Sequence, residues 1–275
     1  MQVLREMLQG AAIFTKGVAL VKEPSIRSFL WLPLLINIFL FVVMIIGIFV
    51  FWDSLVSWGA TTSHFPDWLR AWEGVFSWII ILFKAILWMA FVFFMMSFVG
   101  VAFTGICNFI AAPFNGFLAE KIEEKLTGER CKSLLFHQLI VRTLLRELQK
   151  ILYWLPKLVL VTLVSFILGF IPGLNILGVL LTLSFSAWII ALQYIDYVMD
   201  NNQVSFSQTL KLMRARRFFC LGFGFVALPL SLVPIVSLIA MPLSVCAGTY
   251  LGLILMTRPF VFLKFSEVDN KRLVG

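Results

Sequence analysis

The chain has 275 residues, of which 61% are hydrophobic and only 13% are charged, and its mean hydropathy is +1.00. Soluble domains are roughly half apolar and about a quarter charged, so this composition excludes a soluble protein. The net charge of +8 would suit a nucleic-acid partner, but in a membrane chain the positive-inside bias is the simpler explanation. We therefore expect no nucleic acid, and we predict a single membrane domain over residues 1–275.

The apolar runs are long and have helical rather than alternating periodicity, which favours an all-α integral membrane protein over an outer-membrane barrel. Residues 1–23 predict an amphipathic helix on the membrane surface, because apolar residues recur there at a spacing of three to four. This segment has no continuous apolar core and no small-residue cleavage site, so we do not expect a cleavable signal.

Two apolar runs predict spanning helices, at residues 24–52 and 75–112. The first is long enough to cross a hydrocarbon core of ~30 Å. The second would be ~57 Å long as a helix and must tilt, bend or protrude. Its one charge, Lys84, is expected to snorkel towards the surface, and a place on a transport pathway is the alternative.

Residues 113–157 carry most of the central charges and predict cytoplasmic or interfacial helices. Arg142, Arg146 and Lys150 follow one another at i, i+4 and i+8 and form one stripe. We interpret this stripe as a basic face towards anionic lipid, with an anion path as the alternative.

Two further apolar runs, 158–198 and 218–257, predict helical hairpins because Gly and Pro residues interrupt each run. Their leading arms, 158–169 and 221–228, would be only ~18 Å and ~12 Å long, too short to cross ~30 Å. We therefore predict two partly inserted (re-entrant) hairpins beside the two spans, although a six-span topology gives the same sidedness. Interrupted segments of this kind also point to a transport pathway.

The basic residues fix the orientation of this topology. All Lys and Arg residues except Arg70 and Lys84 fall on one side if both broken runs are hairpins. The positive-inside rule then makes this side, with both termini, cytoplasmic.

The start of the first span resembles an anion site in outline. Pro24 suits the first position of a helix, and the next residues offer free N–H groups beside Arg27, where the helix dipole is positive. The alternative is an ordinary interfacial helix start whose Arg27 contacts lipid phosphate.

Two other groups of polar residues allow a structural and a functional interpretation. Asp196 and Asp200 end one hairpin arm and could pair at the surface with the arginines that begin the next arm, or hold both hairpins around a conduit. Polar residues around Pro113 could line a pathway or cap helix ends. The possible pathway residues are Asn108, Asn115, Glu120, Arg142, Arg146, Asp196, Arg214 and Arg217.

Nothing in the sequence predicts catalysis. The chain has no HExxH, GxSxG or P-loop motif, and its four cysteines are scattered without a CxxC pair. We therefore expect no enzyme activity, no cofactor and no metal site.

Four stretches together resemble the CysZ family of bacterial inner-membrane sulfate permeases, over essentially the whole chain. They follow one another in the order and spacing of that family. They are Pro24–Ser28 with Leu32–Asn37, Ala112–Asn115 with Leu118–Lys121, Tyr194–Tyr197, and Arg217–Gly224 with Ala247–Thr249.

The resemblance implies sulfate uptake across the inner membrane for cysteine biosynthesis, two spans with two partly inserted hairpins, and a homo-oligomer surrounded by membrane lipids. It also implies that sulfate binds at a Gly-Leu-Arg-Arg stretch, which by position is Ser25, Ile26, Arg27 and Ser28. Ser25 and Ser28 replace a glycine and an arginine of that stretch, so we expect weaker binding than at a two-arginine site. The alternatives are a permease for another small oxyanion and a membrane scaffold that transports nothing.

Overall fold

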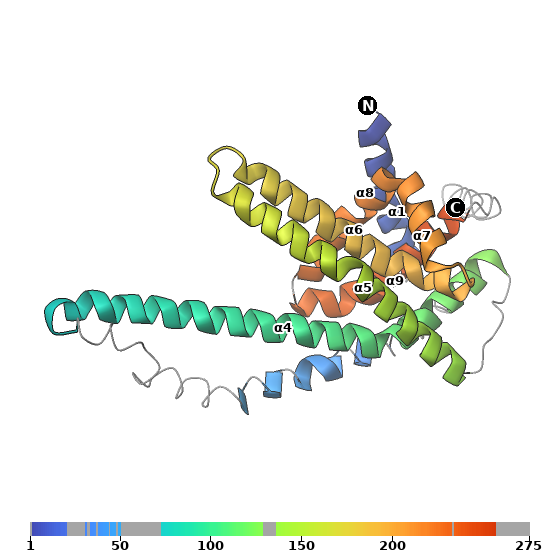
Figure 1. The fold of residues 1–275 in the computed structure, drawn as a ribbon. Coiled ribbons are helices and arrows are strands. Elements are labelled where there is room, and N and C mark those ends of the chain that lie inside the picture. Colours follow the sequence, from blue (N-terminus) through green and yellow to red (C-terminus); the bar gives the residue numbers. More distant parts are fainter. Residues whose placement is uncertain are drawn as a thin grey trace, which may run out of the picture. The chain divides into compact units, whose positions relative to one another are not determined.

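The computed structural model describes residues 2–20, helical pieces between 31 and 50, and residues 73–128, 136–232 and 234–256. Its helices are α1 (Gln2–Ala19), α4 (Glu73–Thr127), α5 (Phe136–Gly169), α6 (Asn175–Asn201), α7 (Phe206–Ala215), α8 (Arg217–Leu232) and α9 (Pro234–Leu255) (Figure 1). The stretch Ser25–Ser28 lies outside the described residues.

The chain forms two compact units. One comprises Asn37–Ile110, which includes most of the predicted spans, and the other comprises Met1–Ile36 with Ala111–Gly275. In the first unit, many apolar side chains are exposed, such as Phe39, Phe49 and Met89. Exposed apolar surface on such a scale is typical of contact with lipid.

The N-terminal helix α1 is amphipathic, as predicted, but protein rather than lipid covers much of its apolar face. Ile13 and Phe14 are buried against the core. Gly10 lies so close to α8 that a Cβ there would be 1.9 Å from the carbonyl oxygen of Phe219. Because glycine has no side chain, the backbones of α1 and α8 can come into direct contact at Gly10. This contact explains why the expected surface helix packs against the protein.

Helix α4 continues through Pro113 to Thr127, whereas we expected a boundary at this proline. A proline inside a helix removes one backbone hydrogen bond, and packing of the following turns can compensate for that loss. The turns after Pro113 are buried on one face, where Asn115, Leu118 and Ile122 are fully covered.

The hairpin of α5 and α6 differs from its predicted form. Helix α5 has 34 residues and runs through Pro156, so the helix does not begin at residue 158 and its length alone does not indicate a short arm. Ile140–Gly169 and Asn175–Asn201 are the two helices among the described residues that are long and apolar enough to cross a membrane. Gly173, with φ of 85°, forms the turn between them.

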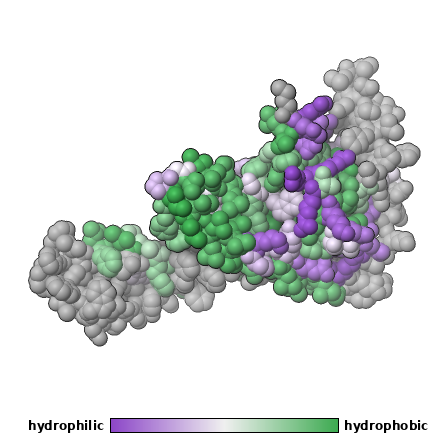
Figure 2. Space-filling model, turned by 45° about the horizontal axis from the view of Figure 1, so that its top comes forward, coloured by the Kyte–Doolittle hydropathy of each residue, from purple (hydrophilic) through white to green (hydrophobic). Residues whose placement is uncertain are grey.

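Lipid-like surroundings suit the end of this hairpin. Phe166, Phe170 and Ile176 are each more than 60% exposed, and the flanks of the hairpin are hydrophobic in Figure 2. Between the arms, the hydroxyl of Ser165 donates to the carbonyl of Gly178 at 3.1 Å and also contacts the hydroxyl of Thr182 at 2.9 Å. The few polar groups there thus find partners within the hairpin.

Helices α8 and α9 form the second predicted hairpin. Helix α8 continues through Pro229 to Leu232, so it is longer than the predicted arm, yet its 16 residues correspond to only ~24 Å. Glycines again allow close packing: a Cβ at Gly224 would be 2.0 Å from the carbonyl oxygen of Ala187 on α6. A Cβ at Gly248 would lie 2.7 Å from the carbonyl oxygen of Tyr194. Helix α6 is therefore the central element of this unit.

Candidate functional site

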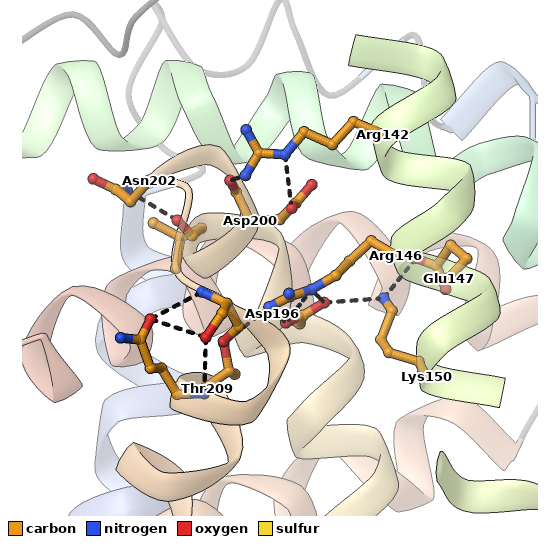
Figure 3. Close-up of polar contacts among 11 residues, drawn as sticks. Arg142, Arg146, Glu147, Lys150, Asp196, Asp200, Asn202 and Thr209 are labelled. Atoms are coloured by element: carbon orange, nitrogen blue, oxygen red, sulfur yellow. Dashed lines mark hydrogen bonds and ion pairs between the residues drawn. The ribbon is translucent and has the colours of Figure 1, made fainter. Parts of the chain in front are cut away.

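Helices α5 and α6 present complementary charges to each other. Arg142, Arg146 and Lys150 lie one turn apart on α5, and Asp196 and Asp200 lie one turn apart on α6 (Figure 3). Arg146 Nη2 is 2.7 Å from Asp196 Oδ1, and Arg142 Nε is 3.1 Å from Asp200 Oδ1. Two ion pairs, one helical turn apart, thus join α5 to α6.

The Arg146–Asp196 pair is the most enclosed part of this arrangement. The side chains are 8% and 1% exposed. Arg146 also donates to the hydroxyl of Thr209 on α7 at 2.9 Å, and its guanidinium lies 5.1 Å from the centre of the Phe206 ring. A buried ion pair is tolerated when further hydrogen bonds satisfy its groups, and Thr209 supplies one of them.

Lys150 lies beside this pair and is 2% exposed. Its ammonium is 2.5 Å from Glu147 Oε1 and 3.8 Å from Asp196 Oδ2. It also lies 4.7 Å from the centre of the Tyr197 ring. Burial of an ammonium group is costly unless nearby groups compensate for its lost hydration, and these contacts supply that compensation.

A chain of hydrogen bonds continues from Glu147 into the core. Gln193 donates to Glu147 at 3.2 Å and to the hydroxyl of Tyr197 at 3.0 Å. Asn115 on α4 donates to the same hydroxyl at 3.4 Å, while its buried Oδ1 has no hydrogen-bond partner among the residues that the structure describes. The network therefore ends at a polar atom with an unused capacity to accept a hydrogen bond.

A pocket of about 570 Å³ opens beside the ion pairs. Its wall combines polar and apolar side chains from α5, the end of α6 and the turn into α7. These are Val141, Arg142, Leu145, Arg146, Gln149, Asp200, Gln203, Val204 and Ser205.

The structure brings several of the predicted pathway residues together and separates others. Arg142, Arg146 and Asp196 meet in the network, and Asn115 reaches it through Tyr197. Glu120 is half-buried on α4, outside the network, and Arg214 and Arg217 are exposed. The side chain of Asn108 and the stretch Ser25–Ser28 lie outside the described residues.

Two interpretations of the charges are wrong in detail. Asp196 and Asp200 pair with α5, not with the arginines at the start of α8. The basic stripe does not face lipid as a whole, because Arg146 and Lys150 are buried against α6. The spacing of residues along one helix shows which of them share a face, but it does not show which element covers that face. Here the face of α6 that carries Asp196 and Asp200 covers it.

Sequence reasoning missed Glu147, Gln193, Tyr197 and Thr209. One signal was present, because Gln193 and Tyr197 share a helical face with the aspartates at i+3, i+4 and i+7. A run of polar residues on one face of an otherwise apolar helix indicates a buried polar network.

Comparisons with known proteins agree on one family. The sequence pattern of the family described as "Sulfate transporter CysZ/Etoposide-induced protein 2.4" matches residues 13–242. A relative from Pseudomonas aeruginosa named Sulfate transporter CysZ is 34% identical over 251 residues, which cover 88% of this chain and 93% of the relative. Relatives with the same name from Pectobacterium atrosepticum and Vibrio parahaemolyticus are 36% and 34% identical and cover 88% and 90% of this chain, and 83% and 96% of their own.

Proposed function

Because the chain belongs to the sulfate transporter CysZ/etoposide-induced protein 2.4 family, we propose that it carries sulfate into a bacterial cell across the inner membrane, where the sulfur supplies cysteine biosynthesis. The observation that supports this most strongly is the similarity to relatives named Sulfate transporter CysZ over nearly the full length of both chains. These relatives are named as transporters, which favours a role without catalysis.

The proposed sulfate-binding stretch is Ser25, Ile26, Arg27 and Ser28. Sulfate is a dianion whose desolvation is costly, and amide N–H groups, two hydroxyls and one guanidinium can replace part of its water shell. Titration of the purified protein with sulfate tests this assignment. Arg27→Ala should weaken binding at least tenfold, and Arg5→Ala, which removes an exposed arginine from α1, should not. Equal affinity of Arg27→Ala and the unchanged protein would rule the assignment out.

The proposed topology is multi-pass with cytoplasmic termini and a partly inserted α5–α6 hairpin. No charged residue occurs between Lys157 and Asp196. Lys157 is exposed, and near it the indole of Trp188 donates to the Tyr153 hydroxyl at 3.3 Å. Lysine, Trp and Tyr are typical of the membrane interface, and only ~18 Å of helix separates Lys157 from Gly169.

The depth to which the α5–α6 hairpin enters the membrane can be tested by labelling single cysteines with a membrane-impermeant maleimide in sealed vesicles. Cysteines at Phe170 and Ile171 should be protected from both sides, whereas a cysteine at Lys157 should react from the cytoplasmic side. Labelling of Phe170→Cys from the outside would indicate a complete span instead. Such incompletely inserted backbone favours contact with neighbouring subunits, and a homo-oligomer in membrane lipid is part of the proposal.

Growth of a bacterium without other sulfate uptake routes tests the function in cells. The protein should restore growth on limiting sulfate, and added cysteine should remove the requirement for it. Restoration on another oxyanion but not on sulfate would favour a different permease. No restoration despite normal insertion would favour a scaffold.

A further inference from the structure

The pocket beside the ion pairs holds unused hydrogen-bond donors. Arg142 gives Nε to the carboxylate of Asp200 and Nη2 to the main-chain oxygen of the same residue. Arg146 gives Nε and Nη2 to Asp196 and Thr209. Among the described residues, Nη1 of neither arginine has a hydrogen-bond partner, and both residues line the pocket.

Hydrogen bonds on the side away from the pocket fix the orientation of both guanidinium groups. Arg146 is buried, and Asp196 and Thr209 fix its orientation. Arg142 is fixed by two hydrogen bonds to Asp200, and in Figure 3 one of its terminal nitrogens points away from that residue. Because their orientation is already fixed, little side-chain entropy remains to be lost when a ligand binds.

The rest of the wall adds polar groups and the start of a helix. Gln149 and Gln203 contribute side-chain amides. Ser205 caps α7 by accepting from the backbone N–H of Gln208 at 3.3 Å, so the positive end of the α7 dipole lies at the pocket. These groups are suited to oxygen atoms of an anion.

The charges around the pocket also set its selectivity. Arg142 and Arg146 face it, Asp200 lines it, and Asp196 lies behind Arg146, so the nearest charges balance. Net charge therefore gives little attraction, and the carboxylate of Asp200 repels any anion. A ligand must gain its affinity from several directed hydrogen bonds, which favours a tetrahedral oxyanion over chloride.

We propose that this pocket binds a tetrahedral oxyanion through the outer N–H groups of Arg142 and Arg146. The oxyanion is dissolved sulfate or phosphate, or the phosphate of a lipid headgroup, since the apolar wall residues Val141 and Leu145 are each 57% exposed and suit an acyl chain. The site is distinct from the stretch 25–28, and it does not depend on the chain transporting sulfate.

Titration calorimetry of the detergent-solubilised Arg27→Ala protein isolates this pocket from the stretch 25–28. The test variant is Arg142→Gln/Asp200→Asn, which removes the guanidinium without leaving its partner unpaired. The matched control is Arg5→Gln, an exposed arginine on α1. Sulfate and phosphate are titrated into the protein separately, and chloride is titrated as the comparison anion. In a separate arm, melting temperature is measured with phosphatidylglycerol and with an uncharged galactolipid in mixed micelles.

Binding of sulfate or phosphate that is at least tenfold weaker in the double variant, and unchanged in the control, supports a site for a dissolved oxyanion. A melting-temperature increase with phosphatidylglycerol alone that the double variant loses supports the headgroup. If neither ligand distinguishes the double variant from the control, the proposal is wrong.

Should the double variant fail to fold, Gln149→Phe keeps the test open. Gln149 is exposed at the pocket wall, so an aromatic ring there blocks the pocket while leaving both ion pairs intact. The same tenfold loss is expected, and full retention of binding would contradict the proposal.

Discussion

Arg146 on α5 holds Asp196 on α6 through three hydrogen bonds, of 2.7 to 3.1 Å, although 50 residues separate them in the chain. The pair lies in the interior of its unit and joins α5 to the central helix of that unit. Removing one partner would leave a buried charge without compensation.

Arg146→Met should therefore reduce the free energy of unfolding by about 3–5 kcal/mol. Asp196→Leu should have a similar effect, because the guanidinium is then the orphaned charge. The double variant should lose less than the sum of the two, and a double-mutant cycle on the protein in detergent measures this difference. Strict additivity would mean that the two side chains do not depend on each other.

The buried ammonium of Lys150 provides a second comparison. Lys150→Met removes the partner of Glu147, so it should cost about 3 kcal/mol of unfolding free energy. Lys157→Met is the control on the same helix, because Lys157 is exposed, and it should change stability by only about 0.5 kcal/mol. Similar losses for both lysines would show that the burial of Lys150 is not decisive.

Close packing of α8 on α6 should make Gly224 intolerant of any side chain. Gly224→Ala places a Cβ 2.0 Å from the carbonyl oxygen of Ala187, so the helices must separate, at a cost of about 1–3 kcal/mol. At Gly169 a Cβ would meet nothing within 4 Å, and Gly169→Ala should be neutral or stabilising. Thermal unfolding of the two variants checks this, and equal melting temperatures would contradict the packing.

The carboxyl of Glu120 gives a prediction that depends on pH. Burial raises the pKa of Glu120 above its ordinary value of 4.5, Glu124 and Glu123 raise it further, and Lys121 opposes them. The folded protein thus disfavours the ionised form, and this penalty is fully present above the folded pKa and disappears as the pH falls towards 4.5.

Glu120→Gln should therefore raise the melting temperature at neutral pH, and the gain should shrink as the medium is acidified. Melting curves of both proteins from pH 8 down to about pH 4.5 measure it. A gain in melting temperature that grows on acidification would contradict the prediction that folding disfavours the ionised form of Glu120.

Composition and hydropathy were sufficient to predict the all-helical membrane class, because a chain with so few charges cannot cover its own surface with polar groups. The Gly and Pro residues that interrupt the run 158–198 also indicated a hairpin there, and Gly173 forms the turn between α5 and α6. The helix ends at prolines were less predictable. Pro113, Pro156 and Pro229 all lie inside helices. At Pro113 the buried turns that follow can compensate for the lost backbone hydrogen bond, whereas α5 continues through Pro156 although its turns there are not buried.

The site was only partly predictable for a different reason. The sequence showed the stripe of Arg142, Arg146 and Lys150 and the two aspartates Asp196 and Asp200. Their pairing, however, depends on how the antiparallel helices α5 and α6 pack against each other. Lipid and an acidic helix are equally suitable neighbours for a basic face. Tertiary packing decides between them, and no local pattern encodes it.

Uptake of labelled sulfate into sealed phospholipid vesicles that contain this protein alone tests the central claim most directly. We predict saturable uptake above that of protein-free vesicles, at least tenfold reduced in Arg27→Ala and unaffected in Arg5→Ala. Uptake no faster than in protein-free vesicles, with the protein folded and inserted, would contradict sulfate transport by this chain.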